Sequence, residues 1–159
     1  MDYTARYGLE FNPFLKNSKD VLVETQEYKE ILFRLKYLIS TKGFGILTGS
    51  AGKGKTTALR SFASSLNPSL YKVLYSSLST LTVMDFYRNL AAELGAVPAY
   101  RKTENFKIIQ DEINRLAIEK RQTPVIIMDE ANYIGTAILN DLKILFNFEM
   151  DSRDRAVVL

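Results

Sequence analysis

The sequence of 159 residues contains neither histidine nor cysteine. The lack of histidine excludes Ser-His-Asp and Cys-His nucleophilic sites, together with histidine-bound metal centres. The lack of cysteine excludes disulfide bonds and thiolate chemistry. It favours a chain that is intracellular or indifferent to redox state, and we expect a cytoplasmic protein.

Long apolar runs are also missing. No stretch approaches the roughly 18 to 20 apolar residues that a membrane-spanning helix needs, and the first 14 residues lack the basic and apolar regions of a signal peptide. We therefore expect no membrane span. The length predicts one domain with a sizeable core. The formal net charge of +3 is compatible with a nucleic-acid partner but does not indicate one.

The hydrophobic pattern predicts alternating helices and strands. Helices are expected over 25–41, 56–66, 83–95, 104–120 and 137–148, and strands over 44–49, 71–77, 125–130 and 156–159. Thr25 is the expected N-cap of the first helix. This alternation is typical of an α/β fold with a parallel sheet, whose binding crevice lies at the carboxyl ends of the strands.

A glycine-rich loop lies between the first predicted strand and the next helix. Residues 49–56, GSAGKGKT, match the pattern G-x-x-x-x-G-K-[ST] in full. Glycines allow backbone N–H groups to point at phosphates, and the helix N-terminus adds its positive dipole end. A chance glycine-rich loop is the alternative, which the strand and helix context disfavours. The expected nucleotide-binding residues are Gly49, Ser50, Ala51, Gly52, Lys53, Gly54, Lys55, Thr56 and Thr57.

Three side chains of this loop have predicted roles. Lys55 is expected to reach the β- and γ-phosphates and to act in catalysis, and the Thr56 hydroxyl is expected to bind Mg²⁺. Thr57 is placed to meet the α-phosphate. For Lys53, which occupies a variable position of the pattern, a solvated side chain is the alternative.

Two acids end the third predicted strand, VIIMDE. Asp129 is expected to hold Mg²⁺, directly or through water, and Glu130 to polarise the water that attacks the γ-phosphate. A water-activating acid favours hydrolysis over the transfer reaction of a small-molecule kinase. A strand that simply ends in solvated acids is the alternative.

GSAGKGKT and VIIMDE together resemble the AAA+ group of P-loop ATPases. FNPF (11–14), EYKEILFRLKYLI (27–39) and DEAN (129–132) are similar to the ATPase domain of the general secretion pathway protein A family. They are closer still to the related ATP-binding transposition accessory proteins of mobile elements. The resemblance covers essentially the whole chain.

This resemblance implies a three-layer α/β/α P-loop fold with strand order 5-1-4-3-2. Beyond Leu159 would lie strand 5, the helical lid and the arginine offered to a neighbouring subunit. Without strand 5 the first strand has an open edge. We therefore expect the sequence to be a piece of a longer protein, with weak ATP turnover by itself. An N-terminal segment and helix, 1–43, would precede the nucleotide-binding core, 44–159. The resemblance also implies an adenine pocket formed by Asn12, Pro13 and Phe14, with plain packing an equal alternative for Phe14. Ser76 or Ser77 would occupy the position that restrains the catalytic glutamate in many relatives.

The function implied is an ATP-binding and ATP-hydrolysing, Mg²⁺-dependent ATPase that acts as an accessory protein in DNA transposition. Its expected partners are double-stranded DNA and a transposase or integrase, and the full-length protein is expected to form a homo-oligomer. The first alternative is an ATPase of a secretion-pathway envelope complex. A P-loop small-molecule kinase is the second alternative.

Overall fold

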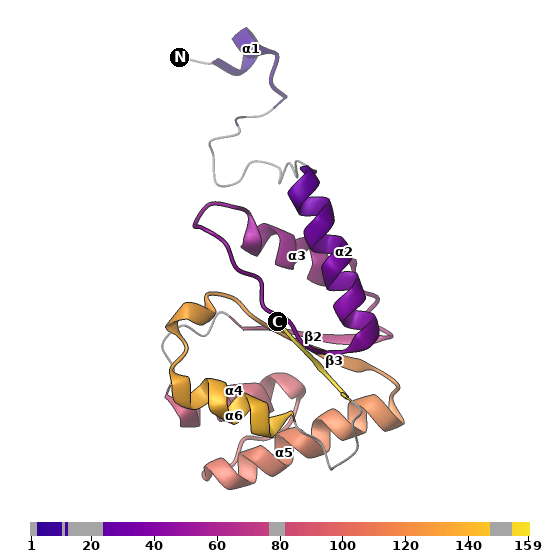
Figure 1. Ribbon diagram of the computed structural model, residues 1–159, viewed down its shortest axis with the longest axis vertical. Coiled ribbons are helices and arrows are strands. Elements are labelled where there is room, and N and C mark those ends of the chain that lie inside the picture. The colour runs from indigo at the N-terminus through magenta and orange to yellow at the C-terminus, as the bar shows by residue number, and fades with distance from the viewer. Residues whose placement is uncertain (1–2, 11, 13–23, 77–81, 147–153) are drawn as a thin grey trace.

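The computed structural model describes residues 3–10, 12, 24–76, 82–146 and 154–159, and its described strands form one parallel sheet (Figure 1). The order in the sheet is β1-β4-β3-β2. This order confirms the 1-4-3-2 part of the predicted arrangement. The strands are β1 (Gly43–Phe44), β2 (Tyr71–Ser76), β3 (Thr123–Met128) and β4 (Val157–Val158).

Helices cover both faces of this sheet, as predicted. Figure 1 shows α2 and α3 on one side of the strands and α4, α5 and α6 on the other. The described helices are α1 (Tyr3–Tyr7), α2 (Gln26–Thr41), α3 (Lys55–Ser65), α4 (Val83–Leu94), α5 (Lys102–Asn114), the π-helix η1 (Arg115–Glu119), the 3₁₀ helix η2 (Ala131–Tyr133) and α6 (Thr136–Leu145). The three-layer α/β/α architecture is therefore confirmed.

Strand β3 lies at the centre and contributes to both hydrophobic cores. Val125 and Ile127 pack with Phe62 of α3 on one face, and Ile126 packs into the core of α4, α5 and α6 on the other. Because consecutive strand residues point to opposite faces, a strand that is covered on both sides must be apolar throughout. That requirement explains the run of apolar residues before Asp129.

Two element boundaries differ from the predicted ones for identifiable reasons. The first strand was expected over 44–49, but its ladder with β4 is limited to Gly43 and Phe44 and ends with the bond from the Gly45 N–H to the Val158 carbonyl. The α5 helix begins two residues before the predicted start at position 104. There the buried Asn105 accepts from the Ala99 N–H at 2.8 Å and donates to the Ala99 carbonyl at 2.9 Å, which fixes the chain that enters the helix.

Helix caps agree with the sequence where it carried a clear signal. The Thr25 side chain accepts from the Tyr28 N–H at 3.2 Å, as the predicted N-cap of α2 should. Gly95 ends α4 in the left-handed conformation. The predicted ends at 77 and at 147–148 lie outside the described residues.

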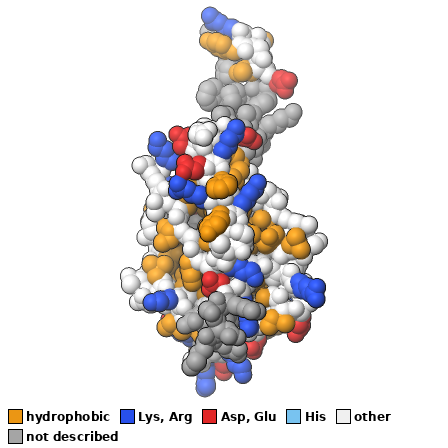
Figure 2. Space-filling view, turned by 45° about the vertical axis from the view of Figure 1, so that its right-hand side comes forward, with side chains coloured by type: hydrophobic (Ala, Val, Ile, Leu, Met, Phe, Trp, Pro, Cys, Tyr) orange, Lys and Arg blue, Asp and Glu red, His pale blue; other side chains and the backbone are white. Residues whose placement is uncertain are grey.

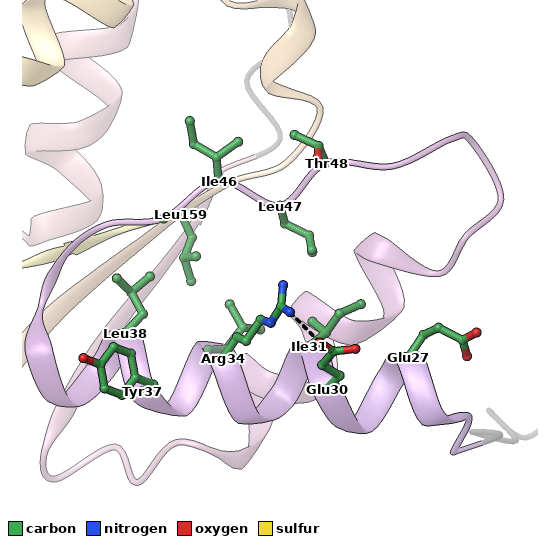
Figure 3. Close-up of a pocket in the computed structure, with 12 residues that line it drawn as sticks. Glu27, Glu30, Ile31, Arg34, Tyr37, Leu38, Ile46, Leu47, Thr48 and Leu159 are labelled. Atoms are coloured by element: carbon green, nitrogen blue, oxygen red, sulfur yellow. Dashed lines mark hydrogen bonds and ion pairs between the residues drawn. The ribbon is translucent and has the colours of Figure 1, made fainter.

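The β1 edge of the sheet is open in the described part of the chain. A groove of about 420 Å³ runs along it between α2 and residues 45–48, with Ile31, Leu38 and Leu47 pointing into it (Figure 3). Ile46 beside it is 90% exposed. Figure 2 shows other hydrophobic side chains reaching the surface between charged ones. None of the described helices is long and apolar enough to cross a membrane.

Truncation of Phe62, a core side chain between the sheet and the helices α2 and α3, should lower the stability of the fold. Phe62 is 0% exposed between α2, α3 and β3, so Phe62→Ala is expected to lower the free energy of unfolding by about 3–5 kcal/mol, measured by urea denaturation. Phe33 on the outer side of α2 is 72% exposed, and Phe33→Ala should stay within about 0.5 kcal/mol of the parent. Equal losses for the two variants would contradict the described packing of α2 and α3.

Candidate nucleotide-binding site

The glycine-rich loop lies directly before α3, as its sequence predicted. Gly52 and Gly54 have φ angles of 77° and 78°, in the left-handed region that favours glycine. No atom lies within 4 Å of a Cβ built at either position, so these glycines are required by backbone conformation rather than by crowding. Gly54 is also the N-cap of α3.

The N-terminus of α3 is suited to bind an anion. The first turn contains Lys55, Thr56 and Thr57 and no acidic residue. Its free N–H groups and the positive end of the helix dipole face the exposed loop. Phosphate groups bind at such helix ends in many nucleotide-binding proteins.

Lys55 lies across the loop rather than extending into solvent. Its ammonium group donates to the Gly49 carbonyl at 2.6 Å and to the Ser50 carbonyl at 3.0 Å. The positive charge is thereby held over the same loop whose N–H groups are expected to receive the phosphates. Lys53 has an exposed side chain, and its predicted contact with nucleotide stays a prediction.

Asp129 follows β3 and contacts both β2 and α3. Its N–H donates to the Ser76 carbonyl at 3.1 Å, which continues the β2–β3 ladder by one residue. The Tyr75 hydroxyl donates to one oxygen of its carboxylate at 2.7 Å, and the Glu130 N–H donates to the other at 3.0 Å. The Thr56 side chain lies close enough to this carboxylate to lower its pKa. Two predicted site residues from distant parts of the sequence, Thr56 and Asp129, thus lie beside each other.

The surroundings of Asp129 favour its ionised form. Burial acts to raise the pKa of this carboxyl, but hydrogen bonds from Tyr75, Thr56 and the Glu130 N–H, with the positive charge of Arg60, outweigh burial and lower the pKa below its usual value. Burial raises the pKa of the Tyr75 hydroxyl, and its bond to Asp129 raises it further. The tyrosine is therefore a neutral donor beside a carboxylate anion.

Glu130 has a strained backbone and an exposed side chain. Its φ of 57° places it in the left-handed region, where it begins η2. A non-glycine residue in this conformation costs of order 1–3 kcal/mol and is found preferentially at functional positions. The conformation supports a functional role for Glu130 beyond that of a solvated acid.

The Thr56–Asp129 pair fits magnesium. The described residues contain no group of three acidic side chains that would form a protein cage for a metal ion. Mg²⁺ usually needs no such cage, since it is held by one or two carboxylates, by waters and by phosphate oxygens of the substrate. A hydroxyl and a carboxylate beside the glycine-rich loop meet that requirement.

The roles predicted for the remaining positions stay predictions. The buried Ser76 hydroxyl has no hydrogen-bond partner among the described residues, and Ser77 lies outside them. Pro13 and Phe14 also lie outside the described residues, and Asn12 stays a predicted adenine contact.

Tyr75 and Arg60 were not predicted from the sequence. The available signal was a tyrosine at the carboxyl end of a strand expected to neighbour the one that ends in Asp129.

Comparison with known proteins identifies the family. Residues 37–159 match a family described as "AAA domain". The chain is 32% identical over 158 residues to "General secretion pathway protein A" of Aeromonas hydrophila, covering 95% of this chain and 28% of that protein. It is 31% identical over 123 residues to "ATP-dependent target DNA activator B" of Escherichia phage Mu, covering 77% of this chain and 37% of that protein, and the same figures hold for the protein of phage D108.

The chain thus spans well under half the length of these relatives. The family match extends over more than half of the chain and includes the glycine-rich loop, β3 and the two acids. Relatives of more than 30% identity cover most of the chain. The chain therefore belongs to the AAA domain family.

Proposed function

We propose that this chain binds ATP with Mg²⁺ and hydrolyses the γ-phosphate. The observation that carries the proposal is that Thr56, at the start of the helix behind the glycine-rich loop, lies beside Asp129, at the end of the central strand. This arrangement brings an element suited to phosphate together with a carboxylate suited to a metal. Neither feature alone would distinguish a nucleotide site from a glycine-rich turn or a solvated acid.

Binding would begin with the phosphates at the loop. The backbone N–H groups at the start of α3 would receive the phosphate oxygens, and Lys55 would exchange the Gly49 and Ser50 carbonyls for the β- and γ-phosphates. That exchange would replace two neutral acceptors by anionic ones, which form stronger hydrogen bonds with an ammonium group.

Thr56 and Asp129 would hold the metal beside these phosphates. Held there by these two residues, Mg²⁺ would supply positive charge that offsets the negative charge of the phosphates. The Thr56 hydroxyl can donate to Asp129 and still present a lone pair to the metal, because a hydroxyl has one donor and two acceptor positions.

Glu130 would activate water for the hydrolytic step. Its carboxylate would accept a proton from the water as the water oxygen bonds to the γ-phosphorus and the bond to the β-phosphate oxygen breaks. The exposed position of Glu130, one residue after the metal carboxylate, supports this role. A kinase would transfer the γ-phosphate to another acceptor and has no use for an acid that activates water.

For the biological role we propose ATP-dependent action on DNA in transposition, with double-stranded DNA and a transposase or integrase as partners and a homo-oligomer as the assembled form. Support comes from the phage Mu relative, which is named as an ATP-dependent target DNA activator. A secretion-pathway role is the alternative, and the 95% coverage by the Aeromonas hydrophila relative favours it.

Removal of the loop lysine should abolish nucleotide binding. In Lys55→Ala the only side-chain cation that lies across the loop carbonyls in the described structure is lost, so ATP affinity should fall below detection in a fluorescence titration. Lys53→Ala, a lysine of the same loop with an exposed side chain, is the matched control and should retain affinity within a few-fold. The assignment of Lys55 fails if the two variants lose affinity equally.

A substitution at Glu130 should separate ATP binding from ATP hydrolysis. Glu130→Gln keeps the size of the side chain at a residue with a left-handed backbone, but the amide cannot accept a proton from water. ATP should therefore bind as in the parent, while phosphate release falls by about 10²–10⁴-fold. The measurement is phosphate release under single-turnover conditions. Normal turnover by Glu130→Gln would mean that another group activates the water.

DNA dependence separates the two biological roles. Phosphate release by the chain should rise when double-stranded DNA is added, and the stimulation should weaken as salt is raised from 50 to 200 mM, because phosphate contacts are salt-sensitive. Heparin at matched charge is the control for a general polyanion effect. Indifference to DNA would count against the transposition role and favour the secretion alternative.

A further inference from the structure

The hydroxyl of Tyr75 is the contact of Asp129 that the proposed mechanism does not use. We infer that Tyr75 is a positioning residue that fixes the Asp129 carboxylate for the metal–nucleotide complex. This inference rests on the proposed function, since it concerns the same metal-binding carboxylate. It assigns a role to a residue outside both sequence motifs.

The sheet places the two side chains on one face. In the parallel β2–β3 ladder Tyr75 pairs with Ile127 and Ser76 with Met128, so Asp129 lies just past the end of the ladder. Tyr75 packs with Ile127 in the core beneath α2 and α3. Strand periodicity directs Asp129, two residues after Ile127, toward the same side. The tyrosine hydroxyl therefore reaches the carboxylate at 2.7 Å from a ring that is held by the core.

The donors around Asp129 limit how its carboxylate can turn. An ionised carboxylate has about four acceptor positions. The Tyr75 hydroxyl and the Glu130 N–H use one position on each oxygen, and they come from β2 and from the turn after β3. A rotation of the carboxylate would break both bonds. The remaining acceptor positions are thereby held in fixed directions, as a metal or its bound water requires.

Arg60 connects this contact to α3 a second time. It lies one helical turn after Thr56, and residues four apart share a face of a helix. Its guanidinium interacts favourably with both Tyr75 and Asp129. A phenol hydroxyl can accept from a guanidinium while it donates to a carboxylate, and a phenylalanine ring can do neither. The hydroxyl of Tyr75, rather than its ring, is thus the group through which Arg60 can be linked to the carboxylate.

The chain offers a matched control on the same strand. Tyr71 lies four residues before Tyr75, packs in the same core and pairs with Thr123 at the far end of the ladder. Four residues of strand span about 13 Å, which keeps the Tyr71 hydroxyl away from Asp129. Both tyrosines fill space between sheet and helices, but only Tyr75 donates to the carboxylate.

The test measures ATP affinity with Mg²⁺ and with EDTA, using a fluorescent ATP analogue, for the unmodified chain, Tyr75→Phe and Tyr71→Phe. Loss of a residue that orients a metal ligand typically costs 10–100-fold in metal affinity or activity. Tyr75→Phe should therefore lose about ten-fold of the Mg²⁺-dependent gain in affinity while its affinity in EDTA stays unchanged. Tyr71→Phe should match the unmodified chain in both conditions.

A second comparison distinguishes positioning from folding. Asp129→Asn removes the charge that Tyr75 is inferred to orient, so adding Tyr75→Phe to it should cause no further loss of the Mg²⁺-dependent gain. An equal further loss would overturn the inference, as would a Tyr75→Phe variant that loses affinity in EDTA together with thermal stability. A parent chain that binds ATP with a normal Mg²⁺ gain while Tyr75→Phe behaves identically would overturn this inference alone. A parent chain that binds no ATP would overturn both it and the proposed function.

Discussion

The complete pairing of β2 with β3 is the constraint on which the site depends. All six residues of β2 are in register with all six of β3, and the ladder continues through the Asp129 N–H to the Ser76 carbonyl. Since β3 is also buried by both cores, its end cannot shift without moving Val125, Ile126 and Ile127. A carboxylate placed immediately after such a strand is positioned by the whole sheet.

The site combines this rigid support with local strain. The Asp129 carboxylate is held by hydrogen bonds from β2 and from the turn after β3, whereas Glu130 beside it is exposed and adopts a left-handed backbone. The division suits two different tasks in the proposed mechanism. A metal ligand benefits from a fixed orientation, while a group that meets incoming water must remain accessible.

Much of the fold could be predicted from the sequence because its signals are local. Apolar runs between turn residues located β2 and β3, helical spacing located α2 and α4, and the glycine-rich loop identified the start of α3. The strand order came from the family resemblance. The short ladder of β1 was not predictable, because its length is set by the strand that pairs with it rather than by its own apolar residues.

The candidate site was predictable to the same extent. The structure places Thr56 and Asp129, two of the predicted site residues, beside each other, while the roles of the motif residues stay predictions. Tyr75 was missed because its contact with Asp129 joins residues 54 positions apart. Its side chain also follows the apolar pattern of β2, and only the register of β2 with β3 shows that its hydroxyl meets Asp129. Arg60 was missed for the related reason that a charged residue on an exposed helix turn has no local signal of a partner.

The central claim is that the glycine-rich loop, Lys55 and the Thr56–Asp129 pair form a grip for the β- and γ-phosphates of a nucleotide. Calorimetric titration of the unmodified chain with ATP and with AMP, each in the presence of Mg²⁺, tests it most directly. The account predicts that ATP binds far more tightly than AMP, because AMP lacks both phosphates that Lys55 and the metal would contact. Equal affinity for the two nucleotides, or no binding of ATP, would contradict it.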